Sequence, residues 1–117
     1  MPFDNPSPKS VCVEILEETR DLLFNGWMQN EYEDGYGNFC MVGALQAAQA
    51  LRPALEYADQ ERCYECISYA IEQTTLWNQR PSVDSRQDIM NFNDAACRTH
   101  ADVLEVMEKA ILVAQGD

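Results

Sequence analysis

The stretch from Gly26 to Leu51, GWMQNEYEDGYGNFCMVGALQAAQAL, decides how this chain folds. Its first half is polar, aromatic and punctuated by glycine, and Asp34-Gly35 is the strongest turn signal in the chain. The second half, from Cys40 to Leu51, consists of small apolar residues that leave almost no polar face. A short helix that is apolar nearly all round is a buried one, so we expect the other helices to pack around it.

The residues around the turn set the shape of the loop that precedes this helix. The flanks of the turn, residues 27–28 and 36–39, predict either a short irregular hairpin or an ordered loop. Aromatic side chains in loops either plug the end of a core or form a contact surface. We expect Trp27 to plug the core, and Tyr32 and Tyr36 to take part in recognition.

Helical patterns flank the stretch on both sides. Further helices are expected over about residues 8–25 and 60–76 and from Thr99 almost to Gly116, and a single helical turn is expected at residues 85–90. The first has Ser7 as its N-cap and runs to Asn25, where Gly26 ends it in a left-handed conformation. The last opens with Thr99 and Asp102 in capping-box spacing. The predicted fold class is therefore all-α, a small four- to five-helix bundle with a short irregular hairpin or loop after the first helix.

The length and charge of the chain limit what it can be. The 117 residues are enough for a single domain over residues 1–117, in which residues 1–7 are a flexible lead-in. Twenty acidic residues against eight Lys plus Arg give a formal net charge of −12, which argues against direct nucleic-acid binding. Such a charge is typical either of a protein with a basic protein partner or simply of good solubility.

The N-terminal sequence and the cysteines bear on where the protein works. The start MPFDNPSPKS lacks the basic and apolar regions of a signal peptide, and no apolar run reaches the length of a membrane span. Five cysteines form an odd number without framework spacing, which favours reduced thiols. We therefore expect a cytoplasmic protein that does not insert into a membrane.

Acidic residues gather on one face of the first predicted helix. Glu14, Glu17, Glu18 and Asp21 share this outer face, which is either solvated, a surface for a basic partner, or a mimic of a phosphate backbone. The loop adds a second set of candidate partner-binding residues: Glu31, Tyr32, Glu33, Asp34 and Tyr36. Its acidic residues do not follow the EF-hand pattern, so calcium binding is not expected.

Cys63-Tyr-Glu-Cys66 is the only formal motif. Two thiols at this spacing could pack in the core, supply half of the ligands of a zinc site, or form a redox pair. Both lie on the apolar face of a predicted helix, away from its N-terminus, which favours core packing. No metal site and no cofactor is predicted.

Several polar side chains could line a pocket instead of having a purely structural role. Cys40 at a helix N-terminus, with His100 as its base, would be an activated thiol. The alternative is that Cys40 is a buried core residue and His100 is an exposed residue with no catalytic role. Asn93 and Asp94 are candidates to line a pocket with Arg98. A small enzyme or ligand-binding module would bring all five side chains into one cavity.

Two blocks of sequence occur together in the same order. Gly26-Trp27 is followed by Cys40 and by VGAL at residues 42–45, and Phe92-Asn93-Asp94 is followed by Arg98-Thr99 and by DVL at residues 102–104. This pattern resembles a family of small uncharacterised proteins of actinobacteria and their phages, a domain of unknown function, over about residues 22–112. Phe92 stands where the family usually has Trp. The resemblance implies no activity, cofactor or catalytic residue.

The residues that carry this resemblance are of types that usually have structural roles. Those we expect to be structural are Gly26, Trp27, Cys40, Gly43, Phe92, Asn93, Asp94 and Thr99. Gly43 would let neighbouring helices approach closely, and Asn93-Asp94 with Thr99 would organise the start of the last helix.

These observations favour a non-enzymatic helical interaction protein, such as a phage accessory protein that binds and modulates a host protein. The acidic first helix and the loop at residues 31–36 would supply the contacts, and self-association into a homo-oligomer stays open. The alternatives are the small enzyme or ligand-binding module described above and a structural metal-binding domain.

Overall fold

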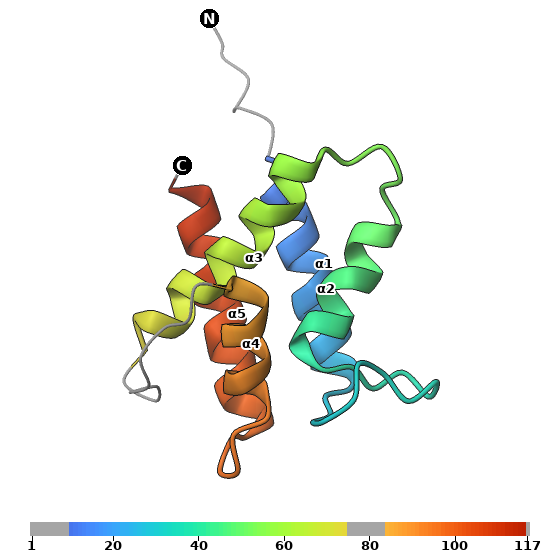
Figure 1. Cartoon of the computed structure of the whole chain (residues 1–117), viewed down its shortest axis with the longest axis vertical. Coiled ribbons are helices and arrows are strands. Elements are labelled where there is room, and N and C mark those ends of the chain that lie inside the picture. The colour runs from blue at the N-terminus through green and yellow to red at the C-terminus, as the bar shows by residue number, and fades with distance from the viewer. Residues whose placement is uncertain (1–9, 75–83, 117) are drawn as a thin grey trace, which may run out of the picture.

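The computed structural model describes residues 10–74 and 84–116, and within these ranges it contains five α-helices and no β-strand. The helices are α1 (Val11–Asn25), α2 (Met41–Ala50), α3 (Tyr57–Glu72), α4 (Ser85–Asn93) and α5 (His100–Gln115). Neighbouring helices pack in the order α3, α5, α1, α2 and α4, and α4 returns to α3 to close the ring around one hydrophobic core (Figure 1). The predicted all-α class is confirmed.

Helix α2 is largely buried, but it is one member of this ring and not its axis. Residues 41–45 are all buried, as the apolar sequence predicted, whereas Leu51 just after the helix is 71% exposed. α2 packs on α1 and α4, while α1 contacts α2, α3 and α5. The contact between α2 and α4 is the smallest in the ring. The prediction of a central helix therefore fits α1 better than α2.

The first helix begins later than its sequence pattern predicted. Ser10 is the N-cap of α1, and its hydroxyl accepts a hydrogen bond from the backbone N–H of Val13 at 3.2 Å. The predicted cap Ser7 and the predicted lead-in at residues 1–7 lie outside the described residues. α1 ends at Asn25 as expected, but Gly26 is in extended conformation with φ of 179°, not in the left-handed region.

The later helices also differ from the prediction at their ends. α3 starts at Tyr57, three residues before the predicted start, and its predicted last residues fall beyond residue 74. α4 is capped by Asp84 rather than Ser85, and it continues for nine residues instead of a single turn. The capping box predicted for the last helix is present, with Thr99 accepting from the Asp102 N–H and Asp102 accepting from the Thr99 N–H.

Residues 26–40 form an ordered loop and not a hairpin. Phe39 makes two isolated bridges, to Trp27 and to Glu33, without a strand on either side. The backbone N–H of Phe39 donates to the carbonyl of Gly26 at 3.1 Å, and that of Met28 donates to the carbonyl of Phe39 at 3.0 Å. These bonds bring the two ends of the loop together at the base of α2.

Two glycines make this loop possible because other backbone comes close to them. A Cβ on Gly43 would meet the carbonyl oxygen of Tyr32, so Gly43 allows the loop to approach α2. The prediction that Gly43 serves helix–helix packing is therefore wrong. A Cβ on Gly26 would likewise meet the carbonyl oxygen of Gly37. Both glycines are therefore required where the backbone of the loop comes close to another segment of backbone.

We expect Gly43→Ala to lower the free energy of unfolding by about 1–3 kcal/mol, because the added methyl group meets backbone that cannot rotate away. Gly116→Ala is the matched control, since its Cβ would make only ordinary contacts, and should change stability by less than about 0.5 kcal/mol. Urea unfolding followed by circular dichroism measures both. Equal stability of the Gly43→Ala variant and the wild type would contradict this role for Gly43.

Candidate functional site

The side chain of Asn93 joins the loop to two helices at the seam between α2 and α4. Asn93 is the last residue of α4 and is fully buried. Its Oδ1 accepts hydrogen bonds from Trp27 Nε1 at 2.8 Å and from the backbone N–H of Met41 at 3.0 Å. Its Nδ2 donates to the carbonyl of Met28 at 3.1 Å and to Asp94 Oδ1 at 2.9 Å. Both donors and both acceptor positions of the amide are therefore used.

The loop also covers the C-terminal end of α4. Gln29 Nε2 donates to the carbonyls of Asn93 and Ala95, both at 2.9 Å. The backbone N–H of Asn30 donates to Asp94 Oδ1 at 2.9 Å, and Asn30 itself has a left-handed φ of 74°. Carbonyls at a helix end lack partners within the helix, so these bonds satisfy groups that would otherwise face water. Asn93 and Asp94 thus organise the loop rather than the start of the last helix.

The outer part of the loop is held by the side chain of Asp34. Asp34 Oδ1 accepts from the backbone N–H of Tyr36 at 2.8 Å, and Oδ2 accepts from Asn38 Nδ2 at 2.7 Å. These hydrogen bonds, the one from Asn38 first, hold the pKa of the Asp34 carboxyl below its usual range. Gly35 and Gly37 supply the left-handed φ angles of 80° and 92° that the turns need. The tip of the loop therefore has a defined shape although it faces solvent.

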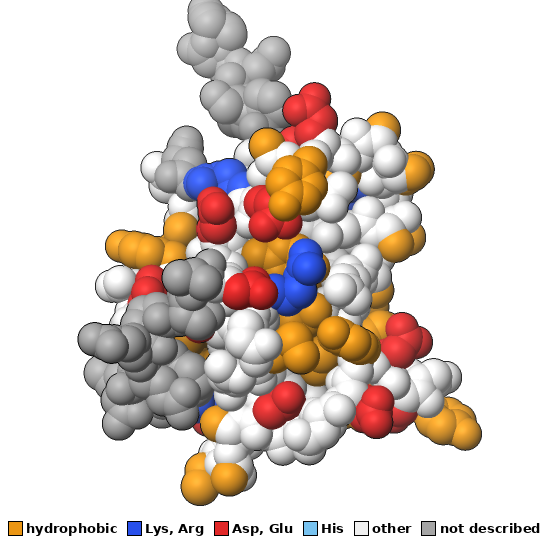
Figure 2. All heavy atoms as spheres, viewed as in Figure 1, with side chains coloured by type: hydrophobic (Ala, Val, Ile, Leu, Met, Phe, Trp, Pro, Cys, Tyr) orange, Lys and Arg blue, Asp and Glu red, His pale blue; other side chains and the backbone are white. Residues whose placement is uncertain are grey.

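The loop presents its aromatic and acidic side chains outward. Tyr36 is 90% exposed and Tyr32 is 49% exposed. Glu31, Glu33 and Asp34 are all exposed as well. Figure 2 shows acidic side chains and a protruding hydrophobic one at the lower right, where Figure 1 shows the loop projecting from the helices. The loop residues predicted to bind a partner thus lie together on one projection.

A small pocket lies between this loop, the start of α2 and the end of α4. Its volume is about 130 Å³, and its lining residues are Asn30, Glu31, Tyr32, Cys40, Met90, Asn93 and Asp94. Pockets for cofactors and drug-sized ligands are larger, on the order of 300–1,000 Å³. The sequence predicted three of the lining residues, namely Cys40, Asn93 and Asp94. It gave no signal for Met90, which sits on the preceding turn of α4.

Arg98 and His100 do not line this pocket, contrary to the prediction of one cavity with five polar side chains. Arg98 Nε donates to the carbonyl of Phe92 at 2.8 Å, and its guanidinium lies 3.6 Å from the centre of the Phe92 ring. Burial lowers the pKa of Arg98. His100 is half-buried rather than exposed, stacks on Trp27 and contacts the carbonyl oxygen of Leu23 through Nε2. Both side chains tie helices and loops together.

Cys40 has the surroundings of a structural thiol. It is the N-cap of α2, and its Sγ accepts from the backbone N–H of Gly43 at 3.3 Å. Burial raises the pKa of Cys40, although hydrogen bonds from backbone N–H groups oppose this effect. His100, the base that the sequence suggested for this thiol, instead contacts Leu23 and Trp27.

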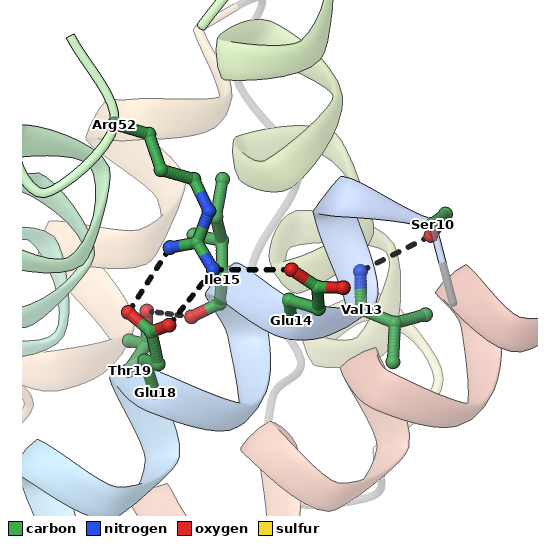
Figure 3. A network of polar contacts seen from close by, with 7 residues as sticks. All are labelled: Ser10, Val13, Glu14, Ile15, Glu18, Thr19 and Arg52. Carbon is green, nitrogen blue, oxygen red and sulfur yellow. Dashed lines mark hydrogen bonds and ion pairs between the residues drawn. The ribbon is translucent and has the colours of Figure 1, made fainter. Parts of the chain in front are cut away.

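Arg52 neutralises part of the acidic face on α1. It follows α2 in the chain and reaches across to α1, where it binds Glu18 at 2.8 Å and Glu14 at 3.2 Å (Figure 3). A second bond to Glu18 at 3.1 Å makes that pair bidentate. Asp21 pairs with Arg20 at 3.2 Å. The sequence did not predict these ion pairs, and they mean that Glu14 and Glu18 already hold a cation from the same chain.

The CxxC motif is buried and its cysteines do not pair with each other. Cys63 is fully buried, and its thiol contacts Cys12 of α1 at 3.7 Å. The contact with Cys12 and burial raise the pKa of Cys63, and burial raises that of Cys66. No three His, Cys, Asp or Glu side chains gather as a metal site anywhere in residues 10–74 and 84–116. Both cysteines therefore belong to the buried core, and Cys63 lies where α3 meets α1.

We expect Asn93→Ala to lower the free energy of unfolding by about 3 kcal/mol, since it leaves the buried Met41 N–H and the partly buried Trp27 donor and Met28 acceptor without their partner. Asn91→Ala on the same helix removes an exposed bond to Gln87 and should cost less than about 0.5 kcal/mol. Chemical unfolding of both variants checks this. If Asn93→Ala lowered the free energy of unfolding as little as Asn91→Ala does, the Asn93 amide would not hold the loop and the two helices together.

The Arg52–Glu18 pair should give a coupling energy of about 0.2–1 kcal/mol in a double-mutant cycle with Arg52→Gln and Glu18→Gln, because both side chains are partly exposed. The coupling should shrink in 1 M NaCl through screening. A cycle between Arg52→Gln and Glu105→Gln, on the distant α5, is the control and should show no coupling. Absence of coupling between Arg52 and Glu18 at low salt would contradict the conclusion that Arg52 neutralises part of the acidic face of α1.

Comparison with known proteins gives one match. The model of a family of unknown function, DUF6197, matches residues 8–112, and the chain belongs to this family. No curated protein and no solved structure matches the chain significantly. Within the part of the chain that the structure describes, no helix is both long and apolar enough to span a membrane.

Proposed function

We propose that this chain is a non-enzymatic interaction protein that binds another protein through the loop of residues 30–38, which we call the recognition loop. The observation that supports this most strongly is that the recognition loop is exposed and yet fixed by hydrogen bonds. Asp94 holds its start through Asn30, and Asp34 holds its tip through Tyr36 and Asn38. A loop that is ordered before binding loses little conformational entropy in the complex, which favours affinity.

The chemistry of the recognition loop suits a basic partner. Tyr36 at the tip is a large, rigid side chain of the kind that anchors protein interfaces. Glu31, Glu33 and Asp34 surround it with negative charge, and the chain carries a net charge of −12 that would steer a basic protein toward it. Two copies of the same acidic loop would repel each other, so a different, basic protein fits better than self-association through this surface.

The acidic face of α1 has a smaller part in this proposal. Glu14 and Glu18 contact Arg52, and Asp21 contacts Arg20, so their charge is partly balanced within the chain. Reversing Glu14 and Glu18 would also break the Arg52 contacts and confuse a binding experiment. The recognition loop is therefore the better place to test partner binding.

The small pocket supports an interaction role more than an enzymatic one. Its volume of about 130 Å³ suits a single side chain rather than a substrate with a cofactor. Together with the sequence resemblance to proteins of actinobacteria and their phages, this supports an accessory protein that binds and modulates a host protein.

The test is affinity capture from the native host with a Tyr36→Ser, Glu33→Gln double variant. We expect at least tenfold weaker recovery of the partner, because the variant removes the anchor and one charge while leaving the hydrogen bonds of Asp34 in place. Tyr57→Ser on α3 is the matched control, since Tyr57 is 73% exposed but lies outside the recognition loop. Equal recovery by the double variant and the control would overturn the proposal.

A further inference from the structure

We propose that the pocket at the base of the recognition loop receives one cationic side chain, a lysine or an arginine, of the partner protein. This inference rests on the proposed function and names the group that the same site would recognise. Three observations on the pocket support it: its size, the two acidic residues that line it, and its apolar wall.

The size and position of the pocket suit one side chain that projects from another protein. Its volume of about 130 Å³ is close to that of engineered cavities that hold a single benzene ring, about 150 Å³. One side is formed by residues 30–32 of the recognition loop, and the other by Met90, Asn93 and Asp94 at the end of α4. A partner bound to the loop would therefore lie directly over the opening.

Two of the residues that line the pocket are acidic, and no cation among the described residues pairs with either of them. Asp94 is fixed in place because its Oδ1 accepts from the backbone N–H of Asn30 and from Asn93 Nδ2. In residues 10–74 and 84–116, neither its Oδ2 nor the carboxylate of Glu31 has a hydrogen-bond or ion-pair partner. Arg98, although close in sequence to Asp94, pairs with Asp102 at 3.7 Å. The pocket therefore has negative charge that no basic side chain in residues 10–74 and 84–116 balances.

The remaining wall is apolar and suits the stem of a long basic side chain. Met90, Cys40 and Tyr32 supply this wall, and Figure 2 shows hydrophobic side chains at the surface between α2 and α4. Lysine and arginine place their methylene groups along apolar surface while the charged end reaches polar groups. An aromatic ring such as that of Tyr32 adds attraction for the cation. An apolar side chain would instead remove the two carboxylates from water without pairing them.

The direct test uses short peptides as probes of the pocket. The amide spectrum of ¹⁵N-labelled protein is titrated with acetyl-Gly-Arg-Gly-amide and acetyl-Gly-Lys-Gly-amide, and with the citrulline and leucine peptides as uncharged controls. We expect saturable shifts at Asn30, Glu31 and Asp94 with the two cationic peptides, with dissociation constants of about 1 mM or weaker. Shifts of equal size with citrulline or leucine, or no shift with arginine and lysine, would overturn the inference.

Matched variants locate the binding in the pocket. Glu31→Gln and Asp94→Asn remove charge, and the asparagine keeps an Oδ1 acceptor for Asn30 and Asn93. We expect each to weaken binding of the arginine peptide at least fivefold, while Glu33→Gln, on the loop but outside the pocket lining, changes it less than twofold. If Asp94→Asn disturbs the fold, Glu31→Gln decides alone because its side chain is exposed. Equal effects of Glu31→Gln and Glu33→Gln would show that the peptide responds only to the overall negative charge of the loop, and would contradict binding in the pocket.

Capture from the host separates this inference from the proposed function. Loss of the partner with the loop-tip double variant but not with Glu31→Gln would contradict the pocket and leave the recognition loop standing. Peptide binding in the pocket, with a partner that ignores both sets of variants, would contradict the proposed function and show that the pocket alone accepts cations. Loss of the partner with both sets supports both.

Discussion

The buried amide of Asn93 is the interaction on which the rest of this structure depends. One side chain accepts from the Trp27 indole and from the first amide of α2, and donates to the Met28 carbonyl and to Asp94. Buried polar groups without partners are costly, so this set of bonds permits one arrangement of the loop, α2 and α4 and disfavours others. It lies at the smallest helix–helix contact of the ring, between α2 and α4, where apolar packing alone specifies the geometry least.

From this point the structure extends outward to the surface that we propose is functional. Asp94 continues the network to Asn30, where the recognition loop begins, and Gly43 lets Tyr32 lie against α2. The pocket exists because the loop is held at this distance from α4, and Glu31 and Asp94 are among the residues that line it. The buried amide of Asn93 and the surface that we propose for partner binding are thus parts of one polar network.

The sequence predicted the helices well where its signals are local. Hydrophobic spacing and the Thr99–Asp102 capping box identified α5, and the apolar run after Cys40 identified α2 within one residue at each end. α4 was predicted too short, because Asn91 and Asn93 are poor helix formers and the burial of Phe92 outweighs that preference. Spacing also could not reveal that Arg52 meets α1, or that Gly43 faces Tyr32 rather than a helix. Of the candidate pocket, Cys40, Asn93 and Asp94 were found by their chemistry, whereas Met90 and the loop side of the cavity depend on how α4 and the loop meet.

The measurement that tests this account most directly is ¹⁵N relaxation of the backbone amides from Gly26 to Cys40 and of the Trp27 indole. If Asn93 and Asp34 fix the loop as described, order parameters should be near 0.85 through this segment and at the indole, as in rigid helices, even though Glu31 to Gly37 are exposed. Order parameters below about 0.6 at residues 30–38 would show a loop that moves freely on the picosecond to nanosecond timescale. That result would contradict both the anchoring by Asn93 and the preorganised surface built on it.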